Sequence, residues 1–177
     1  MPNAAAEAKK AEGNNFFKRG DYDNAIKLYS QAIEIDPSNH AYWSNRSASY
    51  AGLGQYEQAA EDGMQCIRVN KQFIKGYFRA ATAQQNLGQN DAALQTVKAG
   101  LAIDSSNADL KRMQKELEEA VRVKKVQVLV KQAQEELECS DFGKCLRTVD
   151  QGLRLDAGNA DLERIKAQAE PRFERQE

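Results

Sequence analysis

A period of 34 residues constrains the fold of this chain more than any other feature of its sequence. Two series of small residues follow this step: Gly20, Gly54 and Gly88, and Ala25, Ala59 and Ala93. Aromatic residues follow it in the pairs Phe16/Tyr50 and Trp43/Tyr77. The frame divides the chain into repeats at residues 6–39, 40–73 and 74–107. A period of this length is typical of stacked helix–turn–helix units, so we expect an all-α protein.

The recurring residues are those that a packed helix pair requires. Small residues on the first helix (Gly13, Ser47, Ala81) and on the second (the alanine series) would let the two helix axes approach closely. The glycine series is expected to end each first helix in a left-handed backbone conformation. Because one helix pair cannot bury both of its faces, the repeats are predicted to stack into a solenoid.

A degenerate fourth repeat is predicted at residues 126–159. Its segment 140–145 aligns with 20–25, and its segment 155–159 aligns with 35–39. Cys145 lies 52 residues after Ala93, so 18 residues are inserted, which equal about five helical turns and keep one face in register.

The insertion predicts one long helix over residues 107–138, which leads into the fourth repeat. Its apolar stripe would contain Leu110, Met113, Leu117, Val121, Leu129, Ala133 and Leu137. Residues 160–177 are predicted to form a capping helix that Pro171 breaks or kinks. Two domains are therefore expected, residues 6–107 with three repeats and residues 108–177 with the remainder.

Composition excludes nucleic acid and membranes as expected partners. The net charge is −1, which gives no global attraction to polyanions. The longest apolar run, Val126 to Val130, is interrupted by Gln127, whereas a membrane span needs about 20 apolar residues. The first ten residues lack the apolar core of a signal peptide, and we expect a cytoplasmic protein.

The sequence predicts neither an enzyme nor a metal or cofactor site. Cys66, Cys139 and Cys145 have no CxxC spacing, and we expect reduced thiols used in packing. His40 is the only histidine and has no candidate nucleophile beside it. Phosphate-binding loops, nucleophile elbows and HExxH pairs are absent from the sequence, so no catalytic residue is assigned.

A set of polar residues is predicted to carry the function. Positions 2, 5, 6 and 9 of each repeat lie on its first helix, which is expected to line the inner surface of the solenoid. These positions supply the polar cluster: Lys10, Asn14, Asn45, Lys75 and Arg79. Two ammonium groups, a guanidinium and two amides in one groove would attract an anion. A terminal aspartate offers two carboxylates, and capture of a C-terminal carboxylate is an established mode of peptide recognition.

The 34-residue pattern resembles the tetratricopeptide repeat (TPR), which forms a right-handed superhelical solenoid of antiparallel helix pairs. Three segments resemble the dicarboxylate-clamp motifs of chaperone-binding TPR domains: Lys10-Ala11-Glu12-Gly13-Asn14, Ser44-Asn45-Arg46-Ser47 and Lys75-Gly76-Tyr77-Phe78-Arg79. Such domains occur in heat-shock-organising (stress-induced phosphoprotein) co-chaperones, in serine/threonine protein phosphatase 5 and in large immunophilins. The resemblance covers about residues 6–107.

The resemblance implies a ligand, the C-terminal Glu-Glu-Val-Asp tail of cytosolic heat-shock proteins 70 and 90. Lys10, Asn14 and Asn45 would hold its terminal carboxylate. Lys75 would hold the aspartate side chain, and Arg79 would meet an upstream glutamate or the peptide backbone. For Phe17 and Phe78, two roles remain open: contact with an apolar residue of the ligand, or packing in the core. The matching positions of repeat four hold Gln127, Val130, Lys131 and Gln134, so no second clamp is expected there.

Two alternatives to a chaperone-binding adaptor remain at this stage. The chain could be a structural scaffold that self-associates through the long helix or repeat four, although a monomer is expected. It could also be a detached TPR module of a phosphatase or immunophilin-like enzyme.

Overall fold

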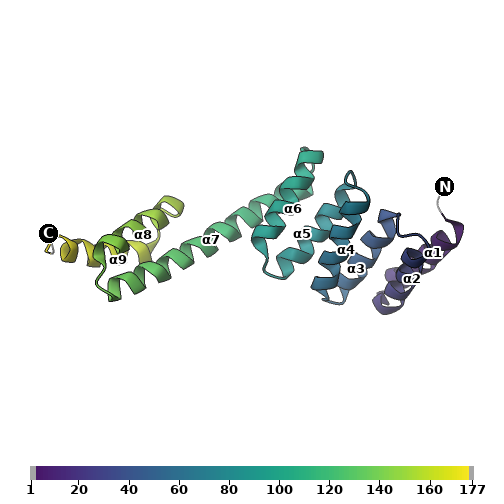
Figure 1. The fold of residues 1–177 in the computed structure, drawn as a ribbon, viewed down its shortest axis with the longest axis horizontal. Coiled ribbons are helices and arrows are strands. Elements are labelled where there is room, and N and C mark those ends of the chain that lie inside the picture. The colour runs from purple at the N-terminus through teal and green to yellow at the C-terminus, as the bar shows by residue number, and fades with distance from the viewer. Residues whose placement is uncertain (1–2, 176–177) are drawn as a thin grey trace. The chain divides into compact units, whose positions relative to one another are not determined.

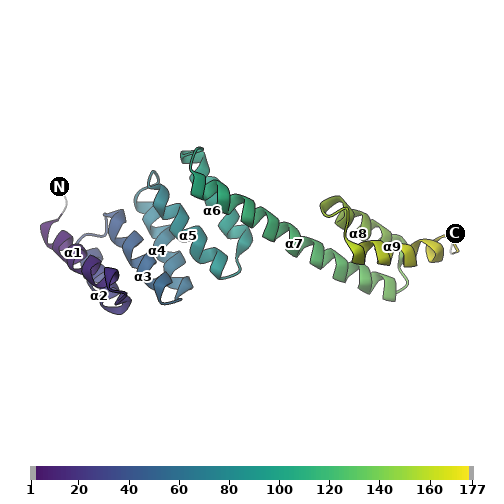
Figure 2. The ribbon, with the colours of Figure 1, turned by 180° about the vertical axis from the view of Figure 1, so that it is seen from behind.

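The computed structural model describes residues 3–175, and within them it contains nine α-helices and no strand (Figures 1 and 2). The first six form the three predicted pairs: α1 (Ala4–Lys18), α2 (Tyr22–Ile35), α3 (His40–Gly52), α4 (Tyr56–Val69), α5 (Ile74–Asn86) and α6 (Asn90–Ile103). The other three are α7 (Ala108–Glu138), α8 (Phe142–Leu155) and α9 (Ala160–Phe173). The all-α solenoid predicted from the sequence is confirmed.

The chain divides into two compact units, Met1–Leu117 and Glu118–Glu177. In the first unit, α1 to α6 lie side by side in chain order (Figures 1 and 2). Each helix of this series contacts the next, and α3 also contacts α5 directly. The first helices of repeats two and three are therefore neighbours, and side-chain hydrogen bonds from α3 to α1 link repeats one and two, so side chains of all three helices can share one surface.

The predicted helix ends are confirmed by the backbone. Gly20, Gly54 and Gly88 have φ angles of 76°, 72° and 72°, in the left-handed region that favours glycine. Ser140 holds the same position in the fourth repeat and has a φ of 60°. Repeat four thus keeps the geometry of the turn without the residue that suits it.

The small residues lie where the helices cross, as predicted. Ala25, Ala59 and Ala93 are completely buried. The Ser47 hydroxyl donates to the Ala59 carbonyl at 2.7 Å, which ties the two helices of repeat two at their crossing. Repeat four has the same contact with the roles exchanged, since the Cys145 thiol donates to the Ala133 carbonyl at 3.3 Å.

Each unit has its own apolar core. In the first unit, one cluster consists of Ala81, Ala93, Val97, Leu110, Met113 and Leu117, and another of Ala6, Ala32, Ile33 and Tyr42. The core of the second unit contains Val126, Ala133, Leu137, Phe142, Cys145, Val149, Leu162, Ile165 and Ala169. The predicted stripe of the long helix is buried except at Val121, which is half-buried.

The expectation for one cysteine is wrong, and one of the two effects expected of Pro171 does not occur. Cys139 is exposed rather than packed, because it lies at the end of α7, whereas Cys66 and Cys145 are buried. Pro171 does not break α9, which continues to Phe173. The proline removes the one backbone hydrogen bond that its N–H would donate to the carbonyl four residues earlier, and α9 continues despite this loss.

Among residues 3–175, none of the helices combines the length and the apolar character that crossing a bilayer requires. Within the same range, no three or more His, Cys, Asp or Glu side chains are grouped so that they could hold a metal ion.

Candidate functional site

The polar cluster comes from three neighbouring first helices. Helix α1 carries Lys10 and Asn14, α3 carries Asn45, and α5 carries Lys75 and Arg79. Lys75 is exposed and the other four side chains are partly exposed, so all five can reach solvent. The five residues therefore remain available to a ligand, unlike the buried small residues on the same helices.

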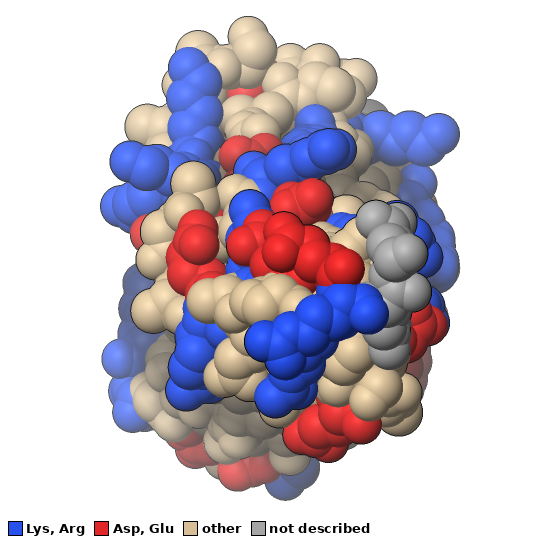
Figure 3. Space-filling view, turned by 90° about the vertical axis from the view of Figure 1, so that its left-hand side faces the viewer, with Lys and Arg blue, Asp and Glu red and all other residues tan. Residues whose placement is uncertain are grey.

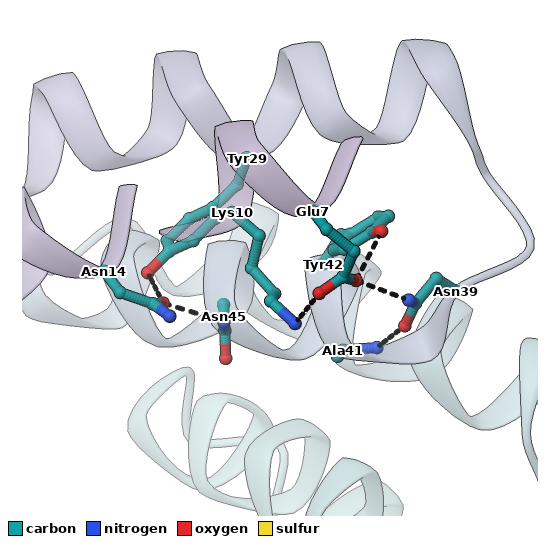
Figure 4. Close-up of polar contacts among 8 residues, drawn as sticks. All are labelled: Glu7, Lys10, Asn14, Tyr29, Asn39, Ala41, Tyr42 and Asn45. Carbon is teal, nitrogen blue, oxygen red and sulfur yellow. Dashed lines mark hydrogen bonds and ion pairs between the residues drawn. The ribbon is translucent and has the colours of Figure 1, made fainter. Parts of the chain in front are cut away.

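Asn14 and Asn45 lie in direct contact across two repeats (Figure 4). The Asn45 Nδ2 donates to Asn14 Oδ1 at 3.2 Å. The same Oδ1 accepts from the Tyr29 hydroxyl of α2 at 2.7 Å. These two bonds occupy the acceptor of Asn14, and its amide hydrogens have no other partner in the described part of the chain. The pair thus presents amide donors that could bind an anion.

Tyr29 fixes the orientation of Asn14 and is itself held by the core. Its side chain is 1% exposed, and burial raises the pKa of its hydroxyl to about 12. The hydroxyl therefore stays protonated and remains a donor at neutral pH. Tyr29 could not be assigned to the site from the sequence, because its contact with Asn14 joins residues on different helices.

Lys10 lies beside this amide pair and is tied to an acidic network (Figure 4). Its Nζ forms an ion pair with Glu7 Oε2, one turn earlier on α1. Glu7 Oε1 accepts from the Tyr42 hydroxyl at 2.7 Å and from Asn39 Nδ2 at 3.3 Å. The hydrogen bond from Lys10, followed by that from Tyr42, lowers the pKa of Glu7. Lys10 is thus held toward α3, where Asn45 also lies.

Lys75 and Arg79 line a cavity of about 330 Å³. Ile74 and Phe78 form its apolar side, and Asn107 and Asp109, at the start of α7, complete it. The Arg79 Nε is buried and has no hydrogen-bond partner among residues 3–175, and burial lowers the pKa of the guanidinium. The rest of the guanidinium is partly exposed and could donate to an anionic or carbonyl oxygen in this cavity.

The two phenylalanines have different surroundings. Phe78 lines the cavity with Lys75 and Arg79. The Phe17 ring meets the Tyr22 ring edge to face, with centroids 5.4 Å apart, within repeat one. Phe78 therefore packs against the core of the first unit and also borders the cavity, whereas Phe17 packs α1 against α2.

Arg46, next to Asn45 in the sequence, anchors α3 to the neighbouring helices. Its guanidinium bonds both oxygens of Asp62 on α4, at 2.7 and 2.8 Å, and donates to Ser30 on α2 at 2.9 Å. It also lies 5.1 Å from the Trp43 ring centroid. Asp62 is 5% exposed, so this forked pair is shielded from water and holds the helix that presents Asn45.

The positive charge of the polar cluster is local. The net charge of the chain is −1. Figure 3 shows a different face, seen from the side of Figure 1 where α8 and α9 lie, and acidic and basic side chains are interspersed there as well. Attraction of an anion must therefore come from the few side chains that converge on one place rather than from the field of the whole chain.

Two segments of this sequence match known protein families. Residues 13–54 match a family described as "TPR repeat", and residues 40–73 match one described as "Tetratricopeptide repeat". Among curated proteins, serine/threonine-protein phosphatase 5 of Rattus norvegicus is 40% identical over 119 residues, which is 67% of this chain and 24% of the phosphatase. The chain therefore spans about a quarter of the length of that relative.

Solved structures resemble the repeat region. The first TPR of Spaghetti (RPAP3), bound to HSP90 peptide SRMEEVD, has a TM-score of 0.64 at 26% identity and covers 68% of this chain and 98% of its own. The second TPR domain of the human RPAP3 protein, in complex with HSP70 peptide SGPTIEEVD, has a TM-score of 0.64 at 30% identity, with coverages of 67% and 98%.

Proposed function

Because this chain belongs to the tetratricopeptide-repeat family, we propose that its first three repeats bind the C-terminal carboxylate of a partner protein. The observation that carries this proposal is the contact between Asn14 and Asn45, which leaves amide donors beside the ammonium group of Lys10. A terminal carboxylate can accept from several donors at once, whereas a neutral amide end lacks the charge that Lys10 would bind.

The proposed roles follow from the placement of each side chain. Lys10, Asn14 and Asn45 hold the terminal carboxylate. Lys75 holds the side chain of a terminal aspartate, and the partly exposed guanidinium of Arg79 bonds an upstream glutamate or a backbone carbonyl.

An aliphatic ligand side chain would enter the cavity against Phe78 and Ile74. We assign Phe17 to packing within repeat one, because its ring contacts Tyr22. The apolar contact would then help to select the residue upstream of the terminal aspartate.

The proposed ligands are the Glu-Glu-Val-Asp tails of heat-shock proteins 70 and 90, because similar domains are described in complex with such peptides. The chain would act in the cytoplasm as a co-chaperone adaptor without catalytic activity. Residues 6–107 would form the clamp domain, and residues 108–177 a second domain. The match to a phosphatase covers 24% of that protein and gives no ground for proposing its activity here.

Calorimetric titration of the 177-residue chain with the peptide Met-Glu-Glu-Val-Asp tests the proposal. We expect micromolar affinity that weakens as salt is added, because the main contacts are partly exposed charge pairs. The same peptide with an amidated C-terminus should bind at least about tenfold more weakly, since it loses a charge-assisted contact. Equal binding of the two peptides, or binding of neither, would refute the proposal.

Substitution of one cluster lysine provides the first prediction. Lys75→Ala should weaken binding of the acid peptide about tenfold, because it removes an ammonium group from a carboxylate contact. Lys9→Ala is the matched control, since Lys9 lies about 100° around α1 from Lys10 and should leave affinity within about twofold. Circular dichroism should show unchanged helicity for both variants. Equal losses for the two would mean that net charge, and not the cluster, sets the affinity.

A further inference from the structure

A second, larger cavity lies within the unit Glu118–Glu177, and none of the residues of the polar cluster lines it. It has a volume of about 870 Å³, in the range of ligand-binding pockets. We call it the C-terminal groove and define it by Gln127, Val130 and Gln134 of α7 and Arg164, Ile165 and Gln168 of α9.

The repeat frame explains why a groove forms there. Gln127, Val130 and Gln134 hold positions 2, 5 and 9 of the fourth repeat, whose frame is 126–159. A further step of 34 residues begins at residue 160, where α9 also begins. In that frame, Arg164, Ile165 and Gln168 hold positions 5, 6 and 9. The C-terminal groove is therefore built from the positions that carry the polar cluster in repeats one to three.

The floor of the C-terminal groove is apolar and well packed. Val126 and Ile165 are 4% and 1% exposed and belong to the core of this unit, and Val130 packs against that core. The residues of the floor are thus already held in place by packing. An aliphatic ligand side chain that lies on Val130 would leave water without any need to order these residues first.

The walls of the C-terminal groove carry side-chain amides. Gln127 and Gln168 are exposed and make no hydrogen bond among the residues that the structure describes, while Gln134 donates to Glu138 at 3.0 Å. Each free glutamine offers a carbonyl acceptor and an amide donor. Those groups match the backbone of an extended peptide, whereas the backbone of a helical ligand is already hydrogen-bonded within itself.

Charge distinguishes the C-terminal groove from the polar cluster. Its lining includes two cations, Lys131 and Arg164, and three anions, Glu135, Asp156 and Asp161. Arg164 is paired with Asp161 at 3.0 Å, and Lys131 lies 3.8 Å from Glu135. One negative charge is therefore in excess, which repels an acidic tail and is complementary to a ligand with a basic residue.

We propose that the C-terminal groove binds an internal, extended segment of a partner protein that combines an aliphatic side chain with a neighbouring Lys or Arg. Binding would not need a free C-terminus, because the groove lacks the unpaired cations that a carboxylate requires. The chain would then hold two partners by different chemistry, one by its terminal carboxylate and one by an internal segment.

Selection from a library of seven-residue peptides tests this proposal. The peptides are displayed on phage at the N-terminus of the coat protein, so none has a free C-terminus, and the target is the immobilised 177-residue chain. Enriched peptides should contain an aliphatic residue and a basic residue. No enrichment, or an acidic consensus, would overturn the proposal.

Variants locate the site at which the enriched peptides bind. Val130→Glu places a charge on the apolar floor and should weaken their binding about tenfold. Val128→Glu is the matched control, because Val128 lies on the same helix, is 58% exposed and does not line the groove. It should leave affinity within about twofold. Gln168→Arg changes only an exposed side chain, so it cannot act through the core, and it should also weaken binding of basic peptides.

The same experiment separates this proposal from its competitors. Lys75→Ala should leave binding of the enriched peptides unchanged, and a loss would show that they occupy the polar cluster instead. Equal binding to the Val130→Glu and Val128→Glu variants would overturn the proposal. So would sedimentation of the chain as a dimer that Val130→Glu dissociates, because the groove would then be filled by a second copy.

Discussion

The five residues of the polar cluster could be selected from the sequence because helical spacing determines which positions share a face. Lys10 and Asn14, like Lys75 and Arg79, are four residues apart and so lie one above the other on their helices. The residues that support them could not be selected in this way. Tyr29 reaches Asn14 from α2, and Tyr42 reaches Glu7 from α3. Such contacts depend on how helices from different segments pack, which periodicity does not describe.

Removal of the Tyr29 hydroxyl is the second prediction. Tyr29→Phe keeps the ring but frees the side-chain amide of Asn14 to rotate, so we expect a few-fold loss of affinity for the acid peptide. The lost hydrogen bond should also lower the free energy of unfolding by about 1 kcal/mol. Calorimetry and urea unfolding measure the two effects.

Tyr56→Phe is the control for this substitution, because no described contact links that hydroxyl to the polar cluster. It should change neither quantity by a measurable amount. If Tyr29→Phe leaves the affinity unchanged while lowering stability, the hydroxyl serves only the fold.

Thiol reactivity is the third prediction. Burial, with a smaller effect of the Asp62 charge, raises the pKa of the Cys66 thiol to about 11, and burial also raises the pKa of Cys145. A raised pKa keeps these thiols neutral at pH 8, and only thiolates react rapidly with iodoacetamide. Mass spectrometry should therefore find Cys139 alkylated first, and Cys66 and Cys145 only when urea is present. Rapid labelling of Cys66 in the native protein would contradict the described packing.

At the scale of the helices, the ends of the elements were predicted best by the residues at the turns. The glycines at the three turns have positive φ as expected, and α7 begins and ends within one residue of the range predicted from the 18-residue insertion. The break predicted at Pro171 does not occur, since α9 continues through Arg172 and Phe173 although the proline has no N–H to donate to the preceding turn.

Relief of backbone strain at Ser140 is the fourth prediction. Ser140 has a φ of 60°, which costs a residue with a side chain about 1 kcal/mol relative to glycine. Ser140→Gly should therefore raise the free energy of unfolding of the C-terminal unit by about this amount. Gly54→Ala, at the equivalent turn of repeat two, should do the opposite to the N-terminal unit. Urea unfolding followed by circular dichroism measures both, and destabilisation by Ser140→Gly would show that the serine side chain is needed.

At the scale of the whole molecule, one repeat frame yields two kinds of surface. At positions 2, 5, 6 and 9, repeats one to three place the lysines, asparagines and arginine of the polar cluster. The same positions of the C-terminal unit hold Gln127, Val130, Lys131 and Gln134, followed by Asp161, Arg164, Ile165 and Gln168. The sequence indicated that repeat four could not form a second clamp. It did not indicate a groove between α7 and α9, because that requires α9 to act as the first helix of a further repeat rather than only as a cap.

The two units also have separate cores, so a substitution in one should leave binding by the other intact. This independence allows the two proposed sites to be tested in one chain. It also means that loss of peptide binding at the polar cluster cannot be attributed to the C-terminal groove.

The side-chain amide resonances of Asn14 and Asn45 give the most direct test of the account. In a nitrogen-15 NMR titration of the full chain, the acid peptide Met-Glu-Glu-Val-Asp should shift both side-chain NH₂ pairs, because their free hydrogens would bond its terminal carboxylate. The amidated peptide at the same concentration should leave them nearly unmoved. If the acid peptide binds and neither asparagine shifts, the terminal carboxylate lies elsewhere, and the proposed clamp is contradicted.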